Sequence, residues 1–394
     1  MSPRSETTSA APHQRTTAHA ADGLPAGAAE RITEVFSAHV RESSGGLAFS
    51  LYREGRPLLR LTGGVTERDG EEPWNEDTMA VLFSGTKGVV ATLAAQLTDR
   101  GLLDPQVPVA EYWPEFAAAG KADVRVHHVL SHTLGLLYAD PEPAAVEERV
   151  DNARMAEILA AQAPLWEPGT KVAYHATTYG YLLAEILLRI TGKGVGELVR
   201  TELSEPWGLD LHLGLPESEE PRVAPIHQAP GYRVQTFLRD DPERRAVVDR
   251  MYGALLTGDE PLYNSRLWHA AELASGGAVG TADAMAKLYS LLIAPEAPLV
   301  SAETLALYTR TWSEGTDAVN DRPLRFGLGY ELDDPIGTYG PVRPAFGHTG
   351  AGGGLHGAWP ERGLAFSLLT NEMQSEDVDT RAKDLLGAVA DLDI

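Results

Sequence analysis

The chain has 394 residues, of which 43% are hydrophobic and 23% are charged; this composition is typical of a globular protein and excludes a mainly disordered or fibrous one. The 33 basic and 56 acidic side chains give a formal net charge of −23, which argues against partners such as nucleic acid or an anionic membrane surface. There is no cysteine, so disulfides, thiolate metal ligands and a cysteine nucleophile are excluded, and covalent catalysis must use oxygen or nitrogen.

The N-terminal stretch is rich in Ser, Thr, Ala, Pro and His, and we predict that residues 1–22 form a disordered tail. This stretch contains no apolar run typical of an export signal. No run of about 18 apolar residues occurs elsewhere, so the sequence predicts no transmembrane helix. We therefore expect a cytoplasmic protein that does not bind membranes.

Residues 23–104 predict the first part of an α/β domain. Apolar residues at helical spacing predict a helix over Leu24–Glu42. Two runs rich in β-formers predict a hairpin of strands at Leu47–Tyr52 and Leu58–Val65. A second, buried helix is predicted over Ser84–Arg100, with Val89, Val90, Leu93 and Leu97 facing inward.

Residues 105–255 predict a mainly helical insertion domain, in which Met155–Gln162 and Tyr179–Thr191 are the clearest helices. Residues 256–394 predict the second part of the α/β domain, which ends in an amphipathic helix over Asp377–Leu392. Its predicted strands are Phe326–Leu332, Ala345–Thr349, Leu355–Trp359 and Leu364–Thr370. This order of elements predicts an antiparallel sheet built from both chain ends and flanked by helices, with an all-α insertion between them.

The strongest candidate for chemistry is the segment Ser84-Gly85-Thr86-Lys87 at the start of the apolar helix. A serine and a lysine three residues apart on a helix lie on the same face. Apolar surroundings disfavour a charged lysine, and a neutral amine can accept the proton of a serine nucleophile. The same four residues would also fit an N-capping serine followed by a surface lysine, so the pattern needs support from elsewhere in the chain.

Two further segments could contribute to such a site. Tyr174 follows the loop Trp166–Gly169 and could carry a proton, although it would also fit a core aromatic residue. Gly347-His348-Thr349-Gly350 lies at the end of a predicted strand and precedes the glycine-rich run 351–354. Glycines there could leave backbone N–H groups free for an oxyanion hole, or could simply form a turn.

These three motifs, in this chain order, resemble those of the serine-reactive family that contains class C β-lactamases, D-Ala-D-Ala carboxypeptidases, D-aminopeptidases and family VIII carboxylesterases. Further segments resemble the same family, namely Val129–Leu136, Glu167-Pro168-Gly169 and Gly276–Ala282. The matches run from about Gly46 to Asn371. The resemblance implies a β-lactamase/transpeptidase-like fold with an active site between its α/β and helical parts.

The resemblance also implies a role for each matching residue. Ser84 would be the nucleophile that becomes acylated, and Lys87 and Tyr174 would share the proton transfers. The backbone N–H groups of Ser84 and Ala351 would form the oxyanion hole. The residues expected to line the substrate are His348, Thr349, Gly350 and His175.

Two departures from the family pattern bear on the substrate. Class C β-lactamases have Asn where this chain has Ala176, and Lys where it has His348, so recognition of an anionic β-lactam is weakened. We therefore expect a hydrolase that acts on a small-molecule ester or thioester through a Ser84 acyl-enzyme. An acyltransferase of a natural-product pathway, with an alcohol or amine as acceptor, is the alternative. A β-lactamase or D-amino-acid peptidase, or a non-catalytic binding protein, fits less well.

We expect no cofactor and no metal. His128 and His132 have the spacing of two helical metal ligands, but no glutamate general base lies between them, and the segment matches a structural part of the family. The run Gly350–Gly357 lacks the Gly-Lys-Ser/Thr ending of a phosphate-binding loop. The sequence does not indicate an oligomeric state, nor whether Lys87 or Tyr174 is the principal base.

Overall fold

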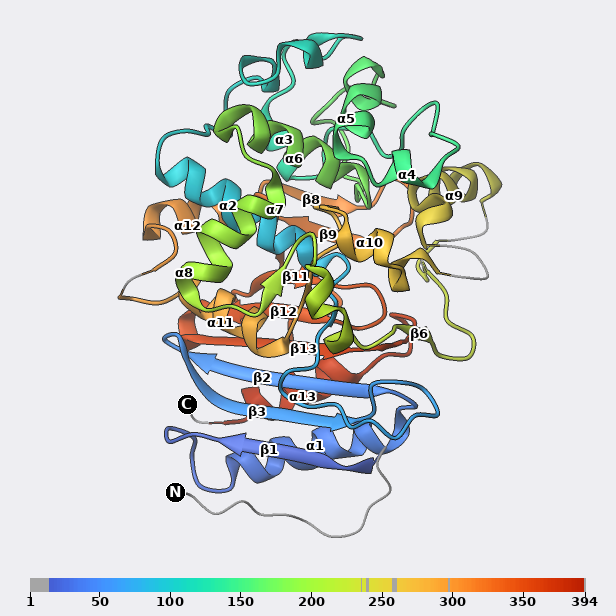
Figure 1. Ribbon diagram of the computed structural model, residues 1–394. Coiled ribbons are helices and arrows are strands. Elements are labelled where there is room, and N and C mark those ends of the chain that lie inside the picture. The colour runs from blue at the N-terminus through green and yellow to red at the C-terminus, as the bar shows by residue number, and fades with distance from the viewer. Residues whose placement is uncertain (1–13, 235, 239–240, 257–260, 297, 393–394) are drawn as a thin grey trace.

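A nine-stranded antiparallel sheet is the largest element of the fold. The protein is represented by a computed structural model that describes residues 14–234, 236–238, 241–256, 261–296 and 298–392. The strand order is β1-β3-β2-β13-β12-β11-β10-β9-β8, so strands from the two ends of the chain meet where β2 pairs with β13 (Figure 1). The strands are β1 (Thr16–Ala20), β2 (Gly46–Arg53), β3 (Arg56–Gly64), β8 (Ser313–Thr316), β9 (Pro323–Phe326), β10 (Glu331–Leu332), β11 (Phe346–Thr349), β12 (Leu355–Trp359) and β13 (Leu364–Thr370).

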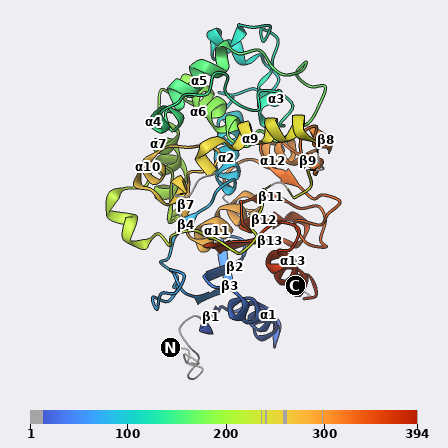
Figure 2. The same cartoon turned by 90° about the vertical axis from the view of Figure 1, so that its right-hand side faces the viewer.

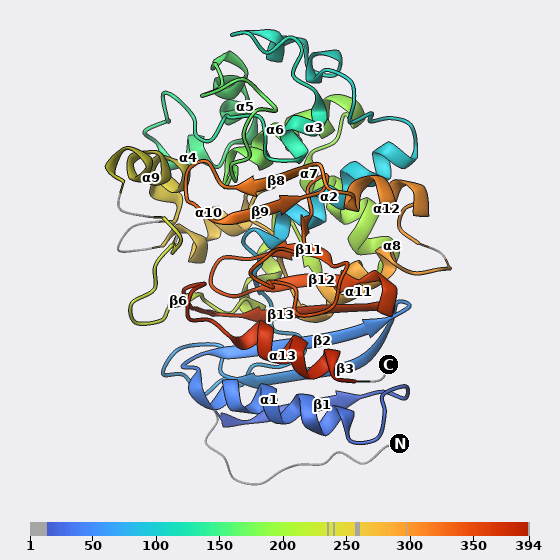
Figure 3. The ribbon, with the colours of Figure 1, turned by 180° about the vertical axis from the view of Figure 1, so that it is seen from behind.

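Helices cover both faces of this sheet. On one face, α1 (Ala28–Glu42) packs beside α13 (Arg381–Ala390), and Figure 3 shows both helices in front of the strands. On the other face, α11 (Ala282–Leu292) packs on β2, β12 and β13. Successive residues of a strand point to opposite faces, so Leu47 joins the core under α1 and α13 whereas Ala48 joins the large core on the other side. The central strands are therefore apolar on both faces.

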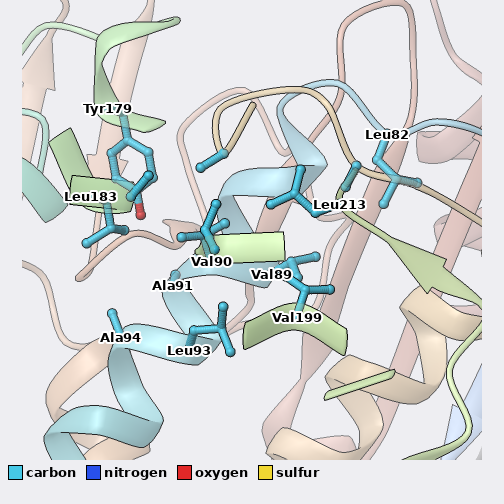
Figure 4. Packing of buried hydrophobic residues seen from close by; sticks show 14 of the residues in the cluster. Leu82, Val89, Val90, Ala91, Leu93, Ala94, Tyr179, Leu183, Val199 and Leu213 are labelled. Carbon is cyan, nitrogen blue, oxygen red and sulfur yellow. The ribbon is translucent and has the colours of Figure 1, made fainter. Parts of the chain in front are cut away.

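The helix α2 (Gly85–Asp99) runs through the middle of the larger core. All of its residues except the last two are buried, which explains why its sequence is apolar on every side. Figure 4 shows its side chains among residues of α6 (Thr178–Thr191) and of the short π-helix η4 (Val199–Ser204), with Val89 beside Val199. Because α2 is buried in this way, the residues at its start, including Ser84 and Lys87, are held in a fixed position.

The part of the chain between α2 and β8 is mainly helical, and Figures 1 and 2 show α3, α5 and α6 at the end of the molecule opposite α1. Its helices are α3 (Val126–Leu130), α4 (Val146–Arg149), α5 (Asn152–Ala161), α6, α7 (Val195–Leu198), α8 (Glu205–Trp207), α9 (Pro242–Leu256), α10 (Arg266–Ala270), α11 and α12 (Ala302–Thr309). Among the described residues, no helix combines the length and the apolar character needed to cross a membrane. The cytoplasmic location stays a prediction.

Short elements connect these parts. A three-stranded sheet has the order β4-β7-β5, and a parallel pair joins β14 to β6. These strands are β4 (Ala80–Val81), β5 (Leu211–His212), β6 (His227–Gln228), β7 (Val279–Gly280) and β14 (Glu372–Met373). The 3₁₀-helices are η2 (Val109–Glu111), η3 (Pro114–Ala117), η5 (Glu217–Arg222), η6 (Leu262–Asn264) and η7 (Pro360–Arg362).

The structure confirms the predicted fold class and corrects two details. The prediction of disorder up to residue 22 is wrong for Thr16–Ala20, because this segment forms β1 and pairs with β3; residues 1–13 lie outside the described residues. The predicted strand Phe326–Leu332 is broken, because Gly329 adopts a left-handed φ of 81° and donates its N–H to the Leu130 carbonyl at 2.8 Å. The domain boundaries after residues 104 and 255 stay predictions.

Candidate active site

A sharp turn presents Ser84 at the start of α2. Phe83, the residue before it, has a positive φ of 46°, a conformation that costs a non-glycine residue energy and persists only where the surroundings enforce it. Here the Leu82 N–H donates to the Ala278 carbonyl at 2.8 Å, and the Phe83 ring packs edge-to-face on Tyr263 with centroids 5.3 Å apart. The turn is therefore held from both sides, and the Ser84 side chain faces a cavity.

The structure brings Ser84, Lys87 and Tyr174 together. The Lys87 Nζ lies 3.1 Å from the Ser84 Oγ, as expected for side chains three residues apart on one helix face. The Tyr174 hydroxyl, which comes from a loop before α6, lies 2.7 Å from the same oxygen. The Lys87 ammonium position is also 4.9 Å from the centroid of the Tyr174 ring. Both predicted proton carriers thus contact the predicted nucleophile directly.

The surroundings of Lys87 suit a neutral amine. Its side chain is fully buried, and its Nζ donates to the carbonyl oxygens of Ala176 and Ser275, both at 2.8 Å. Burial lowers its pKa to about 7, although the charge of Glu331 opposes this shift. A neutral amine has two N–H groups and one lone pair. With both N–H groups on the two carbonyls, the lone pair is directed toward the hydroxyl of Ser84.

Tyr174 is fixed by its backbone and its ring. Its N–H donates to the buried carboxylate of Asp317 at 2.8 Å, and its ring packs on those of His132 and Phe326, with centroid distances of 5.0 and 6.2 Å. Burial, reinforced by the negative charge of Glu331, holds the pKa of Tyr174 well above its usual value. The phenol is therefore neutral near pH 7 and donates its hydrogen to the Ser84 oxygen.

The loop after β11 lies against the turn that carries Ser84. Gly350 approaches so closely that a Cβ there would meet the Leu82 carbonyl oxygen. The loop is closed by a hydrogen bond from the Gly350 N–H to the Gly354 carbonyl at 2.7 Å. Within the described part of the chain, the backbone N–H groups of Ser84 and Ala351 have no backbone carbonyl as partner. Two such free donors beside one cavity have the character that an oxyanion hole requires.

A buried ion pair supports this loop from behind. Arg381 donates from Nη2 to the Gly352 carbonyl at 2.7 Å and from Nε to the Asp379 carboxylate at 2.8 Å. Arg381 comes from the first turn of α13, and its guanidinium is almost completely buried. The conformation of the loop is thus tied to a helix that packs on the sheet.

Two histidines predicted to line the substrate, His175 and His348, are not among the residues that line the cavity. His175 is buried, and its ring accepts a hydrogen bond from the Gly135 N–H at 3.0 Å and contacts the Ala173 carbonyl at 2.8 Å. Its ring therefore holds these two backbone segments in place and does not line the cavity. His348 is also buried, and burial lowers its pKa to about 4. Neighbouring residues of a strand point to opposite faces, and here Thr349 faces the cavity while His348 lies behind it. Thr349 and Gly350, the other two residues predicted to contact substrate, do line the cavity, as does Ala351 of the predicted oxyanion hole; the roles of all three stay predictions.

The structure reveals a carboxylate that the sequence prediction missed. Glu331 on β10 lines the cavity and accepts from the Tyr339 hydroxyl at 2.8 Å, the Thr349 N–H at 3.0 Å and the Thr349 hydroxyl at 3.1 Å. Burial opposes ionisation, but His348, Arg322 and these donors bring the pKa of Glu331 below its usual value. The sequence did contain a sign of this residue, because Glu331 is an acidic residue within the otherwise mainly apolar predicted strand Phe326–Leu332.

The cavity is about 240 Å³ in volume and mainly apolar, as ligand sites usually are. Aromatic and aliphatic residues on both sides of Ser84 contribute to its wall; they include Phe83, Tyr181, Tyr232, Trp268, Leu273 and Leu324. The cavity lies between the helical part and the sheet, because α6 and α10 contribute on one side and β10 and the β11 loop on the other. This is the location that the sequence predicted.

The two histidines with metal-like spacing have other partners. His128 accepts from the Arg125 N–H at 3.1 Å, and His132 accepts from the His175 N–H at the same distance while stacking on Tyr179. In the portion of the chain that is described, no three His, Asp or Glu side chains gather as metal ligands would. His132 instead supports the loop of Tyr174 through its ring.

The fold and this arrangement of serine, lysine and tyrosine define the class of serine-reactive, β-lactamase-like enzymes. A sequence model of the family described as Beta-lactamase matches residues 32–390, and the chain belongs to this family. It is 36% identical to the esterase/beta-lactamase LipL of Mycobacterium tuberculosis over 361 residues, which are 87% of this chain and 81% of that protein. It is 30% identical to the esterase EstB of Burkholderia gladioli, covering 87% and 90% of the two chains.

Solved structures agree with these sequence relatives. The crystal structure of a family VIII carboxylesterase superimposes with a TM-score of 0.83 at 31% identity, covering 94% of this chain and 98% of that chain. The similarity therefore extends over the sheet and the helical part together.

Proposed function

We propose that the protein is a serine ester hydrolase that works through an acyl-enzyme on Ser84. The observation that carries the proposal is the Ser84 oxygen within hydrogen-bonding distance of both Lys87 and Tyr174, at the wall of a mainly apolar cavity. The names of the relatives, which include esterases and a carboxylesterase, support an ester as substrate.

The first step is acylation of Ser84. The neutral amine of Lys87 takes the hydroxyl proton while the serine oxygen attacks the ester carbonyl. The resulting oxyanion accepts hydrogen bonds from the N–H groups of Ser84 and Ala351. When the intermediate collapses, the bond to the alcohol oxygen breaks. Tyr174 donates its phenolic proton to this leaving oxygen and is reprotonated by the Lys87 ammonium.

The second step returns the enzyme to its starting state. Water attacks the acyl-enzyme, its proton passes to the Lys87–Tyr174 pair, and the carboxylic acid leaves as Ser84 regains its hydrogen. We assign the role of principal base to Lys87 because its pKa is lowered to about 7, whereas that of Tyr174 is raised well above 10. Near neutral pH a large fraction of Lys87 is thus ready to accept a proton, and Tyr174 is ready to donate one.

The test is the intact-protein mass after brief exposure to p-nitrophenyl butyrate, with nitrophenol release followed in parallel. Wild type should release nitrophenol continuously, and Ser84→Ala should lose this activity by about 10³-fold or more. Unchanged turnover by Ser84→Ala would contradict the assignment of the nucleophile. A stable butyryl adduct on wild type would show that water is a poor acceptor and would favour an acyltransferase.

A further inference from the structure

The hydroxyl of Thr349 is directed away from the substrate. Its single hydrogen is donated to Glu331 Oε1 at 3.1 Å, and its backbone N–H is donated to the other oxygen of the same carboxylate at 3.0 Å. A threonine hydroxyl has one donor and two lone pairs. Because the donor is occupied, the face of Thr349 that lines the cavity offers only lone pairs. A substrate carboxylate, which needs donors, finds none on this side chain.

Glu331 adds a negative charge at the same place. Glu331 is 7% exposed and lines the cavity, and the charge of Arg322 together with the hydrogen bonds from Tyr339 and Thr349 favours its ionised form. The imidazole of His348 on the neighbouring strand is neutral, since burial lowers its pKa to about 4. The two strands that border this part of the cavity therefore supply a carboxylate and no matching cation.

The half-buried guanidinium of Arg322, which also lines the cavity, is shared among several carboxylates. Arg322 donates from Nε to Glu376 at 2.9 Å, and its Nη2 lies 3.6 Å from the Asp334 carboxylate, while its charge also acts on Glu331. One positive charge thus faces three negative ones. Arg233, which donates to Asp377 at 2.7 Å, and Lys383 also line the cavity, but both are exposed to solvent, where their fields are screened.

We propose that Glu331, acting with Thr349, sets the charge specificity of the site: acyl donors with a carboxylate near the β11 strand are rejected, and neutral or cationic esters are accepted. The inference rests on the proposed ester hydrolysis and names the substrate class for it. Glu331 does not take part in the bond changes. It acts on the substrate through its charge, and it acts through Thr349 by holding the only hydrogen of the hydroxyl.

The test uses three p-nitrophenyl esters of similar length and different charge. These are the neutral hexanoate, the anionic hemiadipate and the cationic 5-(trimethylammonio)pentanoate. With wild type, kcat/KM for the hemiadipate should be lower than for the hexanoate by about tenfold or more, as two like charges several ångströms apart predict, and the cationic ester should not be disfavoured. A hemiadipate that wild type hydrolyses within about twofold of the hexanoate would overturn the proposal without any variant.

Glu331→Gln removes the charge with little change in shape. This substitution should lower the ratio of kcat/KM for the hexanoate to kcat/KM for the hemiadipate by about tenfold. A purely structural loss would instead lower kcat/KM for all three esters alike. The matched control is Glu157→Gln on the exposed side of α5, which changes the net charge equally and should leave the ratio unchanged. An unchanged ratio in a folded Glu331→Gln would refute the role of Glu331.

The two proposals can fail separately. Ser84-independent hydrolysis of the hexanoate would refute the proposed function. Ser84-dependent hydrolysis of all three esters at equal rates would leave the hydrolase in place and refute the charge specificity alone.

Discussion

The protonation of Lys87 predicts the pH dependence of the enzyme. An ordinary lysine with a pKa of 10.5 would be neutral in about 1 in 3,000 molecules at pH 7, whereas a pKa of about 7 makes about half of the molecules competent. Burial thus supplies about a thousandfold more of the neutral base. The value of kcat/KM for a neutral ester should rise about tenfold per pH unit below pH 7 and level off above it.

The assay is nitrophenol release at its isosbestic wavelength between pH 5 and 9, with p-nitrophenyl butyrate as substrate. Tyr174→Phe should lower kcat by about 10² to 10⁴-fold and keep the same apparent pKa, because Lys87 remains the base. Glu331→Gln should move the apparent pKa to lower pH, since the Glu331 charge raises the pKa of Lys87. A wild-type profile without a limb near pH 7, or a limb that disappears in Tyr174→Phe, would refute the assignment of Lys87 as the base.

Three further substitutions test the supports of the site. Asp317→Ala removes the acceptor of the Tyr174 N–H and should lower kcat at least about tenfold, with a smaller loss in Asp317→Asn; equal kcat values in both would contradict this positioning. Arg381→Met should lower kcat about 10- to 100-fold with little change in KM, and Arg381→Lys should recover part of it, if the loop behind Ala351 needs this support. Gly88→Ala places a methyl group against the Tyr289 hydroxyl and should lower the free energy of unfolding by about 1 to 3 kcal/mol, measured by urea denaturation, whereas Tyr289→Phe combined with it should relieve the loss.

The parts of the site that lie close in sequence were predictable from local geometry. The spacing of Ser84 and Lys87 follows from one helical turn, and the apolar neighbours of Lys87 indicated a lowered pKa. Tyr174 lies 90 residues from Ser84, and only the resemblance to a known family connected the two. The carbonyl oxygens of Ala176 and Ser275, which hold the amine, leave no trace in the residue types because every residue has a carbonyl.

The mistakes have physical reasons as well. A motif gives the position of a residue but not the direction of its side chain, and His348 and Thr349 on one strand could not both face the same cavity. In the segment Thr16–Ala20 only the two threonines favour a strand, and it becomes a strand because β3 offers an edge for pairing. The predicted strand Phe326–Leu332 is broken because the N–H groups of residues 328 and 329 donate to the carbonyls of Tyr308 and Leu130 in the helical part. These hydrogen bonds override the local preference for an extended strand.

The pairing of β2 with β13 has a consequence for how the protein is made. In this pair Arg53 lies opposite Leu364, so a ribosome must add about 300 residues after β2 before its partner exists. At about 5 to 20 residues per second, β2 waits roughly 15 to 60 s with one edge unpaired. During this time the hairpin of β2 and β3 presents free backbone donors and acceptors and an apolar surface to other nascent chains. A low concentration of nascent chains, or chaperones that shield this edge, should therefore raise the yield of folded protein.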